Sequence, residues 1–474
     1  MRLNKTVGLL AGTTALTLGG FCYGNTDEAN TSALSQIAEL KAELAAMKAQ
    51  QGEEWLTEQR AADIRGIVQD VLADAETRTS LQSSGATAGY DNGFFISSAD
   101  GNFRLNMNGL VQFQWILNST KDREDASGNA VPDTRWGFGV RRARMDFSGV
   151  FAQDWKFMLQ LQYGSIQNQD PGAEIRAVDT ILGTGNVNVA EAWVERDVEL
   201  GGTSFSLRGG QFKAPFMREW LVDDGDQLAV DRSLLNYYFY QGYSVGLQLG
   251  YNSDMFRAAV AYTNGLGTPA DFATGSYDSS WNSNPTQYSF AGRLDFKFSG
   301  NWADFDNFNS RPGTEGGLMA GVAALYQKYN STAVGADTPT VTGLTGDVTW
   351  NFGGASLFAS FVWENIDPVS GSSRNPWGFM VQGGYFLTDD FEIFGRYSYA
   401  NADTTGGDST KLSLITVGVN YFMSANAKFT ADFGYSLNTL GGLYALQGTG
   451  AGWNADTGNN DGQYAIRTQL QLSF

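Results

Sequence analysis

The 474-residue chain contains no histidine, one cysteine and only nine prolines. Without histidine, the usual nucleophilic triads, histidine metal ligands and histidine proton relays are excluded. One cysteine excludes an intrachain disulfide and a zinc or iron–sulfur site built from several thiolates. Basic residues number 31 against 50 acidic ones, and the net charge of −19 argues against nucleic-acid binding. These absences favour neither an enzyme nor a protein with a cofactor or a bound metal.

What the chain has in excess is glycine, at 58 residues, and aromatic side chains, at 13%. Its longest apolar run near the start, residues 7–18, is too short to span a bilayer and follows two basic residues. We therefore expect residues 1–24 to be a secretory signal peptide, cleaved after Gly24. Cleavage there removes Cys22, and a lipid anchor on Cys22 is disfavoured because Phe21 precedes it.

Residues 25–81 differ from the rest in being rich in Ala, Glu, Gln, Lys and Leu. Apolar residues at heptad spacing form two short patches, Ile37, Leu40, Leu44 and Met47, then Ile64, Ile67 and Val71. The pattern predicts a short helical or coiled-coil segment in the periplasm that self-associates or acts as a tether. Residues 82–92 are predicted to be a linker.

From residue 93 to residue 474 apolar and polar residues alternate with period two. In residues 104–117, for example, Leu105, Met107 and Val111 share one face and Asn106 and Gln112 the other. Sixteen such segments occur, each long enough for a tilted transmembrane strand. They are 103–118, 136–151, 155–164, 186–197, 204–213, 243–252, 255–265, 287–298, 317–328, 343–352, 355–365, 377–388, 391–400, 411–423, 427–437 and 464–474.

The connectors between these segments mostly alternate between long and short. Short turns on one side, long loops on the other and an even strand count are typical of an outer-membrane barrel. One connector, 299–316, should be short and is not. A soluble sandwich needs only about 100–250 residues, and no repeat marks a solenoid. We therefore predict an all-β fold, a sixteen-stranded antiparallel transmembrane β-barrel after a short helical segment.

If the apolar faces meet lipid, the polar faces line water. Nine basic residues then face inward against four acids, Asp146, Asp295, Glu392 and Asp432, although the chain is acidic overall. A cationic wall favours anions, unless the arginines pair with inward acids and only stiffen the wall. Lys213, before Pro215 at a strand end, is a tenth candidate near a constriction. The pore-lining candidates are Arg104, Arg142, Arg144, Lys156, Lys213, Arg293, Lys297, Arg396, Lys428 and Arg467.

Several motifs resemble the phosphate-selective porin O and P family: Asp100–Leu105, Val140–Gly149 with Asp154–Lys156, Gly210–Phe216 and Asp231–Ser233. The resemblance covers most of residues 94–474 and implies a trimeric porin whose long loops fold inward and narrow the channel. The long loop 214–242 carries five acids, which speaks against assuming phosphate selectivity here. The family's phosphate-binding lysines are not assigned to positions in this chain.

Two acidic loop segments, 223–226 and 456–461, have the oxygen-rich composition of calcium sites but lack the spacing of an EF-hand. Solvated acidic loops are the simpler interpretation. The sequence thus predicts an outer-membrane porin for passive diffusion of small hydrophilic solutes, with a preference for anions, including phosphate. The expected partners are outer-membrane lipid and two further copies of the chain. The alternative is an outer-membrane anchor whose N-terminal helix tethers the membrane to the cell wall.

Overall fold

The computed structural model describes residues 38–43, 45, 86–91, 93–122, 130, 132–152, 154–163, 187–269, 286–330, 338–369, 371–404, 410–445, 449–456 and 462–474. The chain divides into two units, Met1–Ser84 and Gly85–Phe474. In the first unit the described residues, 38–43 and 45, are helical. The predicted signal peptide and most of the predicted helical segment 25–81 lie outside the described residues. No helix among those described is long and apolar enough to cross a bilayer.

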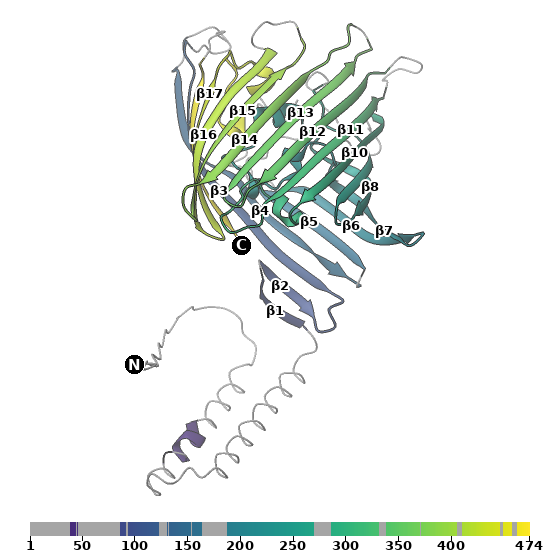
Figure 1. The fold of residues 1–474 in the computed structure, drawn as a ribbon, viewed down its shortest axis with the longest axis vertical. Coiled ribbons are helices and arrows are strands. Elements are labelled where there is room, and N and C mark those ends of the chain that lie inside the picture. Colours follow the sequence, from purple (N-terminus) through teal and green to yellow (C-terminus); the bar gives the residue numbers. More distant parts are fainter. Residues whose placement is uncertain are drawn as a thin grey trace, which may run out of the picture. The chain divides into compact units, whose positions relative to one another are not determined.

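The second unit is a closed antiparallel barrel of sixteen strands, β3 to β18, in which each strand pairs with its sequence neighbours and β18 pairs with β3 (Figure 1). The strands are β3 (Arg104–Ser119), β4 (Thr134–Phe151), β5 (Trp155–Tyr163), β6 (Asn188–Leu200), β7 (Thr203–Lys213), β8 (Tyr243–Asn252), β9 (Phe256–Thr263), β10 (Thr286–Ser299), β11 (Gly317–Tyr329), β12 (Thr340–Asn351), β13 (Ala355–Asp367), β14 (Trp377–Phe386), β15 (Phe391–Asn401), β16 (Lys411–Ser424), β17 (Ala427–Ser436) and β18 (Tyr464–Ser473). The predicted fold class and the sixteen predicted segments are confirmed, with each strand end within three residues of its prediction.

Alternation places large apolar side chains on the outside of this barrel. Phe138, Leu247 and Val322 are 66%, 56% and 59% exposed, although they are apolar. Inward-facing residues of the wall, such as Gln112 on β3, are buried and polar. This inversion of a soluble protein's pattern is the one expected where lipid surrounds the barrel and the interior is polar.

Two further strands precede the barrel, β1 (Ala86–Tyr90) and β2 (Phe94–Ser98), and they pair as a hairpin. β1 lies within the segment 82–92 that the sequence analysis treats as a linker. β2 pairs with residues 104–107 of β3, on the edge that β18 occupies from Leu110 onward. Phe474 exchanges two backbone hydrogen bonds with Gly109 between these two stretches. The hairpin therefore continues the sheet where the C-terminus ends.

Connectors fold into the barrel from both ends. The loop 214–242, between β7 and β8, contains α4 (Arg218–Leu221), η3 (Asp224–Asp226) and α5 (Leu234–Phe239). The connector 299–316 contains η4 (Trp302–Phe305), and the segment between β17 and β18 contains α6 (Gly442–Ala445) and η6 (Thr449–Ala451). Their apolar side chains join inward-facing wall residues in one buried cluster. The interior is therefore partly filled, and any passage runs beside these segments.

Candidate functional site in the barrel lumen

The loop 214–242, here called the constriction loop, is held to the wall by an arginine pair that a β-bulge creates. On β4 the pairing with β3 jumps from Arg142 opposite Gln112 to Val140 opposite Phe113, which leaves Arg141 as an extra residue. A bulge interrupts the alternation of faces, so that Arg141 and Arg142 are both buried. Strict alternation assigned Arg142 to the lumen and missed Arg141, since nothing in the local sequence marks the bulge.

Both guanidinium groups meet Asp231 of the constriction loop. Arg141 Nε lies 2.6 Å from Asp231 Oδ2, and Arg142 Nη2 lies 3.3 Å from Oδ1. The Tyr237 hydroxyl donates a third hydrogen bond to Oδ1 at 2.6 Å. Burial alone raises the pKa of the Asp231 carboxyl, but the two arginines outweigh burial and hold its pKa well below the ordinary value. Asp231 is therefore a buried, permanently charged anchor of the loop.

Two acids of the segment 223–226, Asp223 and Asp224, are likewise paired with arginines. Arg144 Nη2 lies 2.9 Å from Asp223 Oδ2, and Asp224 contacts Arg142 at 3.2 Å, Arg144 at 3.4 Å and also Arg232. Burial raises the pKa of Asp224, but the surrounding arginines bring it well below its usual value. Within the described part of the chain, no group of three or more acidic, histidine or cysteine side chains is arranged to hold a metal ion. Part of the second acidic segment, 457–461, lies outside that part.

Four other predicted pore-lining residues are buried and also engaged. Arg396 donates to the Asp231 carbonyl at 2.8 Å, and Lys428 donates to the carbonyls of Gly225 and Gln227 at 3.0 Å each. Arg293 lies 2.8 Å from Asp347 and donates to the Phe216 carbonyl at 2.8 Å. Arg467 forms a two-pronged pair with Asp432, with both distances 2.7 Å. Three of these residues hold the constriction loop, and Arg467 braces the wall.

The remaining candidates lie apart from this cluster. Arg104 lies beside the hairpin, where it pairs with Asp91 at 3.4 Å. Lys156 is 45% exposed and lies 3.0 Å from Asp197. Lys297 places Nζ 5.3 Å from the ring centre of Trp302. The structure thus brings together Arg142, Arg144, Arg293, Arg396 and Lys428 around the constriction loop, but not Arg104, Lys156 or Lys297.

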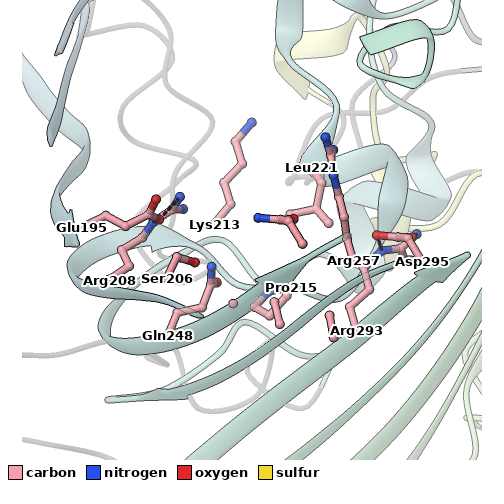
Figure 2. Close-up of a pocket in the computed structure, with 14 residues that line it drawn as sticks. Glu195, Ser206, Arg208, Lys213, Pro215, Leu221, Gln248, Arg257, Arg293 and Asp295 are labelled. Atoms are coloured by element: carbon pink, nitrogen blue, oxygen red, sulfur yellow. Dashed lines mark hydrogen bonds and ion pairs between the residues drawn. The ribbon is translucent and has the colours of Figure 1, made fainter. Parts of the chain in front are cut away.

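A pocket of about 260 Å³ lies between the constriction loop and strands β6 to β10 (Figure 2). Its charged lining residues are Glu195, Arg208, Lys213, Arg257, Arg293 and Asp295. Both acids are already paired, since Glu195 lies 2.8 Å from Arg208 and Asp295 lies 2.6 Å from Arg293. The dashed lines of Figure 2 mark such contacts, and Lys213 has none.

Lys213 and Arg257 contact aromatic rings instead of carboxylates. Lys213 Nζ is 5.2 Å from the ring centre of Trp220, and Arg257 Cζ is 4.3 Å from that of Trp302. No carboxylate among the described residues lies within ion-pair distance of either one. With four basic and two acidic lining residues, the pocket carries a formal charge of 4 − 2 = +2. Lys213 was predicted from the sequence, whereas Arg208 on the same strand and Arg257 on β9 were not.

Comparison with known proteins agrees with this architecture. The model of the family "Phosphate-selective porin O and P" matches residues 114–445. No curated protein matches the chain. Among solved structures, OmpF of Salmonella typhi, in complex with daunomycin, is 11% identical with a TM-score of 0.50, covering 82% of this chain and 100% of its own.

Two further solved structures are similar to this chain. The outer-membrane channel DcaP of Acinetobacter baumannii is 12% identical with a TM-score of 0.50, covering 78% of this chain and 97% of its own. The anion-selective porin of Comamonas acidovorans is 15% identical with a TM-score of 0.47, covering 78% and 99%. The family match spans most of the barrel, from β3 to the segment before β18. The chain belongs to the phosphate-selective porin O and P family and forms an outer-membrane channel.

Proposed function

We propose that this channel lets small hydrophilic solutes diffuse passively and prefers anions. The observation that carries the preference is the pocket beside the constriction loop, whose two acids are neutralised by Arg208 and Arg293. Lys213 and Arg257, which have no carboxylate within ion-pair distance among the described residues, then supply its net positive charge. Charged side chains that line a narrow passage select ions of the opposite sign. In this interpretation the buried arginines elsewhere shape the passage and do not select solutes.

Most of the acidity of the constriction loop does not oppose this preference. Asp223, Asp224 and Asp231 are all paired with wall or loop arginines. Paired charges in close contact present little net field to a passing ion. The acidic composition of the loop is therefore only a weak argument against an anion-selective channel.

The test is planar-bilayer recording of the purified protein in a KCl gradient. We expect stepwise conductance with a reversal potential that indicates a higher permeability for chloride than for potassium. Inorganic phosphate is then titrated in, and block at low phosphate extends the preference to that anion. A reversal potential that indicates a higher permeability for potassium contradicts the proposal. If added phosphate leaves the chloride conductance unchanged, the channel prefers anions in general and has no particular affinity for phosphate.

We further propose a homotrimer and a periplasmic N-terminal segment. The trimer follows from membership of the family and is tested by the mass of the detergent-solubilised complex. The periplasmic location is supported by the hairpin, because β2 pairs with the end of β3 that adjoins the C-terminus. In outer-membrane barrels that end, with its short turns, faces the periplasm. Protease added to intact cells should leave residues 25–85 uncut, while broken cells should lose them.

A further inference from the structure

The connector 299–316 lies on the side of the barrel where the other described turns are short. The neighbouring turn between β12 and β13, for comparison, needs only 352–354. Here the chain inserts η4 and further residues, and buries Phe305 and Phe308 at 1% and 2% exposure. Ser310 is buried as well, whereas residues 312–316 are exposed. Such burial is not needed to join two adjacent strands.

The connector is fixed to the wall at several points. The Trp302 indole donates to the Ser253 carbonyl at 2.8 Å, and Asn309 donates to Glu392 on β15 at 2.6 Å. The Phe308 ring lies 4.7 Å from that of Phe358 on β13. These contacts span the wall from the β8–β9 turn to β15. The connector therefore forms a fixed shelf across part of the periplasmic mouth.

The shelf also contacts the constriction loop from the side of the periplasmic mouth. The Phe308 backbone N–H donates to the Asp226 carbonyl at 3.0 Å, and the Arg218 side chain donates to the Phe305 carbonyl. Beside this junction lies a second pocket of about 240 Å³. Polar side chains from the loop, the shelf and the wall line it, among them Asp226, Asn307, Asn309, Arg311, Lys428 and Gln471.

We propose that the connector 299–316 is a second constriction, which sets the size limit for solutes at the periplasmic exit. The constriction loop narrows the lumen from the extracellular side, and the shelf narrows the space beneath it. Asn307, Asn309 and Arg311 are its size-determining residues, because they form the shelf's side of the second pocket. This inference rests on the proposed diffusion of solutes through the lumen.

The connector can be removed with little strain on the strands. A methyl group placed on Gly300 would lie 2.8 Å from the Cα of Gly317, so the two ends of the connector are side by side. Deleting residues 301–315 joins Gly300 to Gly316 and leaves a two-glycine turn, like Gly353–Gly354 between β12 and β13. We expect the deletion to raise single-channel conductance about twofold and to admit larger polyethylene glycols.

A second variant tests whether the shelf itself narrows the passage, without removing the contacts by which it supports the constriction loop. Asn307→Cys, in a Cys22→Ala background, leaves the Phe308 and Arg218 contacts in place, and Asn307 Oδ1 has no hydrogen-bond partner within the described structure. Modification with a bulky methanethiosulfonate should lower conductance. Asp389→Cys, on the exposed β14–β15 turn and outside both pockets, is the control and should be labelled without effect.

The outcomes distinguish the two proposals. Unchanged conductance and size limit after deletion, beside a conducting parent protein, overturn the role of the shelf alone. Full labelling of Asn307→Cys, verified by mass, without a fall in conductance overturns it as well. A parent protein that never conducts overturns passive diffusion itself.

Discussion

Two sets of basic side chains face the interior of this barrel, and they differ in their partners. The anchoring set, exemplified by Arg141, Arg142 and Arg144, is buried against carboxylates of the constriction loop. The pocket set, Lys213 and Arg257, lies against aromatic rings with no carboxylate in ion-pair range among the described residues. Both sets occupy inward positions, yet only the second has charge left over for a solute. A basic residue's role in this lumen therefore depends on what faces it.

The largest effect is expected from removing Asp231, the carboxylate that pairs with Arg141 and Arg142 of the anchoring set. Asp231→Ala leaves Arg141 and Arg142 buried without their shared carboxylate, which costs about 3–5 kcal/mol by comparison with other broken buried pairs. We expect a lower temperature for the loss of the folded band on unheated gels, and noisy, enlarged conductance. Asp389→Ala, exposed on a turn, is the control. Unaltered stability and quiet channels would show that the pair does not hold the loop.

The pocket set should affect selectivity and leave stability alone. Lys213→Gln with Arg257→Gln removes the pocket's excess positive charge, so the ratio of chloride to potassium permeability should fall about two- to threefold. Reversal potentials in a KCl gradient measure this ratio. Arg196→Gln is a control for charge outside the pocket, because Arg196 pairs with Asp154 at 3.1 Å and stacks on Trp155, which alternation places on the outer face. An equal fall in the control would mean that overall charge, and not the pocket, sets selectivity.

The constriction loop also carries one acid that titrates near neutrality. Burial, and then the neighbouring Asp223 carboxylate, raise the pKa of Asp226 to about 6. Lowering the pH from about 7.5 to about 5 therefore neutralises Asp226 and makes the lumen more cationic. Chloride selectivity should rise modestly over that range, and Asp226→Asn should remove the rise. Because this pKa is raised, any stability gained from protonation is present at low pH and is lost as the pH rises through 6.

Lys156 is intermediate between the two sets in its pairing, and its substitution should give the smallest change in stability and selectivity. Its nearer carboxylate partner is Asp197 at 3.0 Å, and both of these side chains are about half exposed, at 45% and 53%; Glu195 lies farther away, at 3.6 Å. Exposed pairs of this kind contribute about 0–1 kcal/mol. We expect Lys156→Gln to leave thermal stability unchanged and to alter selectivity less than the pocket variants. A loss of stability as large as that of Asp231→Ala would contradict the distinction by burial.

Much of the fold was predictable because a strand that separates lipid from water must alternate. That requirement fixes the sixteen strands and their ends in the sequence itself. The anomalous length of 299–316 was visible for the same reason. What alternation cannot predict is pairing between distant segments. The contact of Arg141 and Arg142 with Asp231, about ninety residues away, depends on a bulge and on the inward fold of a loop.

The alternation of polar residues is compatible with inward arginines that select anions and with inward arginines that pair with acids. The structure favours pairing for Arg142, Arg144, Arg293 and Arg467. Their acidic partners come from the same strand, from other strands and from the loop. Only the same-strand partners, such as Asp295 for Arg293, follow from spacing along the chain. The loop partners require the tertiary fold.

The shared edge of β3 has a mechanical consequence. β2 and β18 occupy successive stretches of that edge, and Phe94 of the hairpin lies 6.4 Å from the terminal Phe474, ring centre to ring centre. A force applied to the chain before residue 86 therefore reaches the hairpin ladder first and the barrel's closing seam next. The short pairings of the β1–β2 hairpin would therefore separate first, before the force could separate β18 from β3.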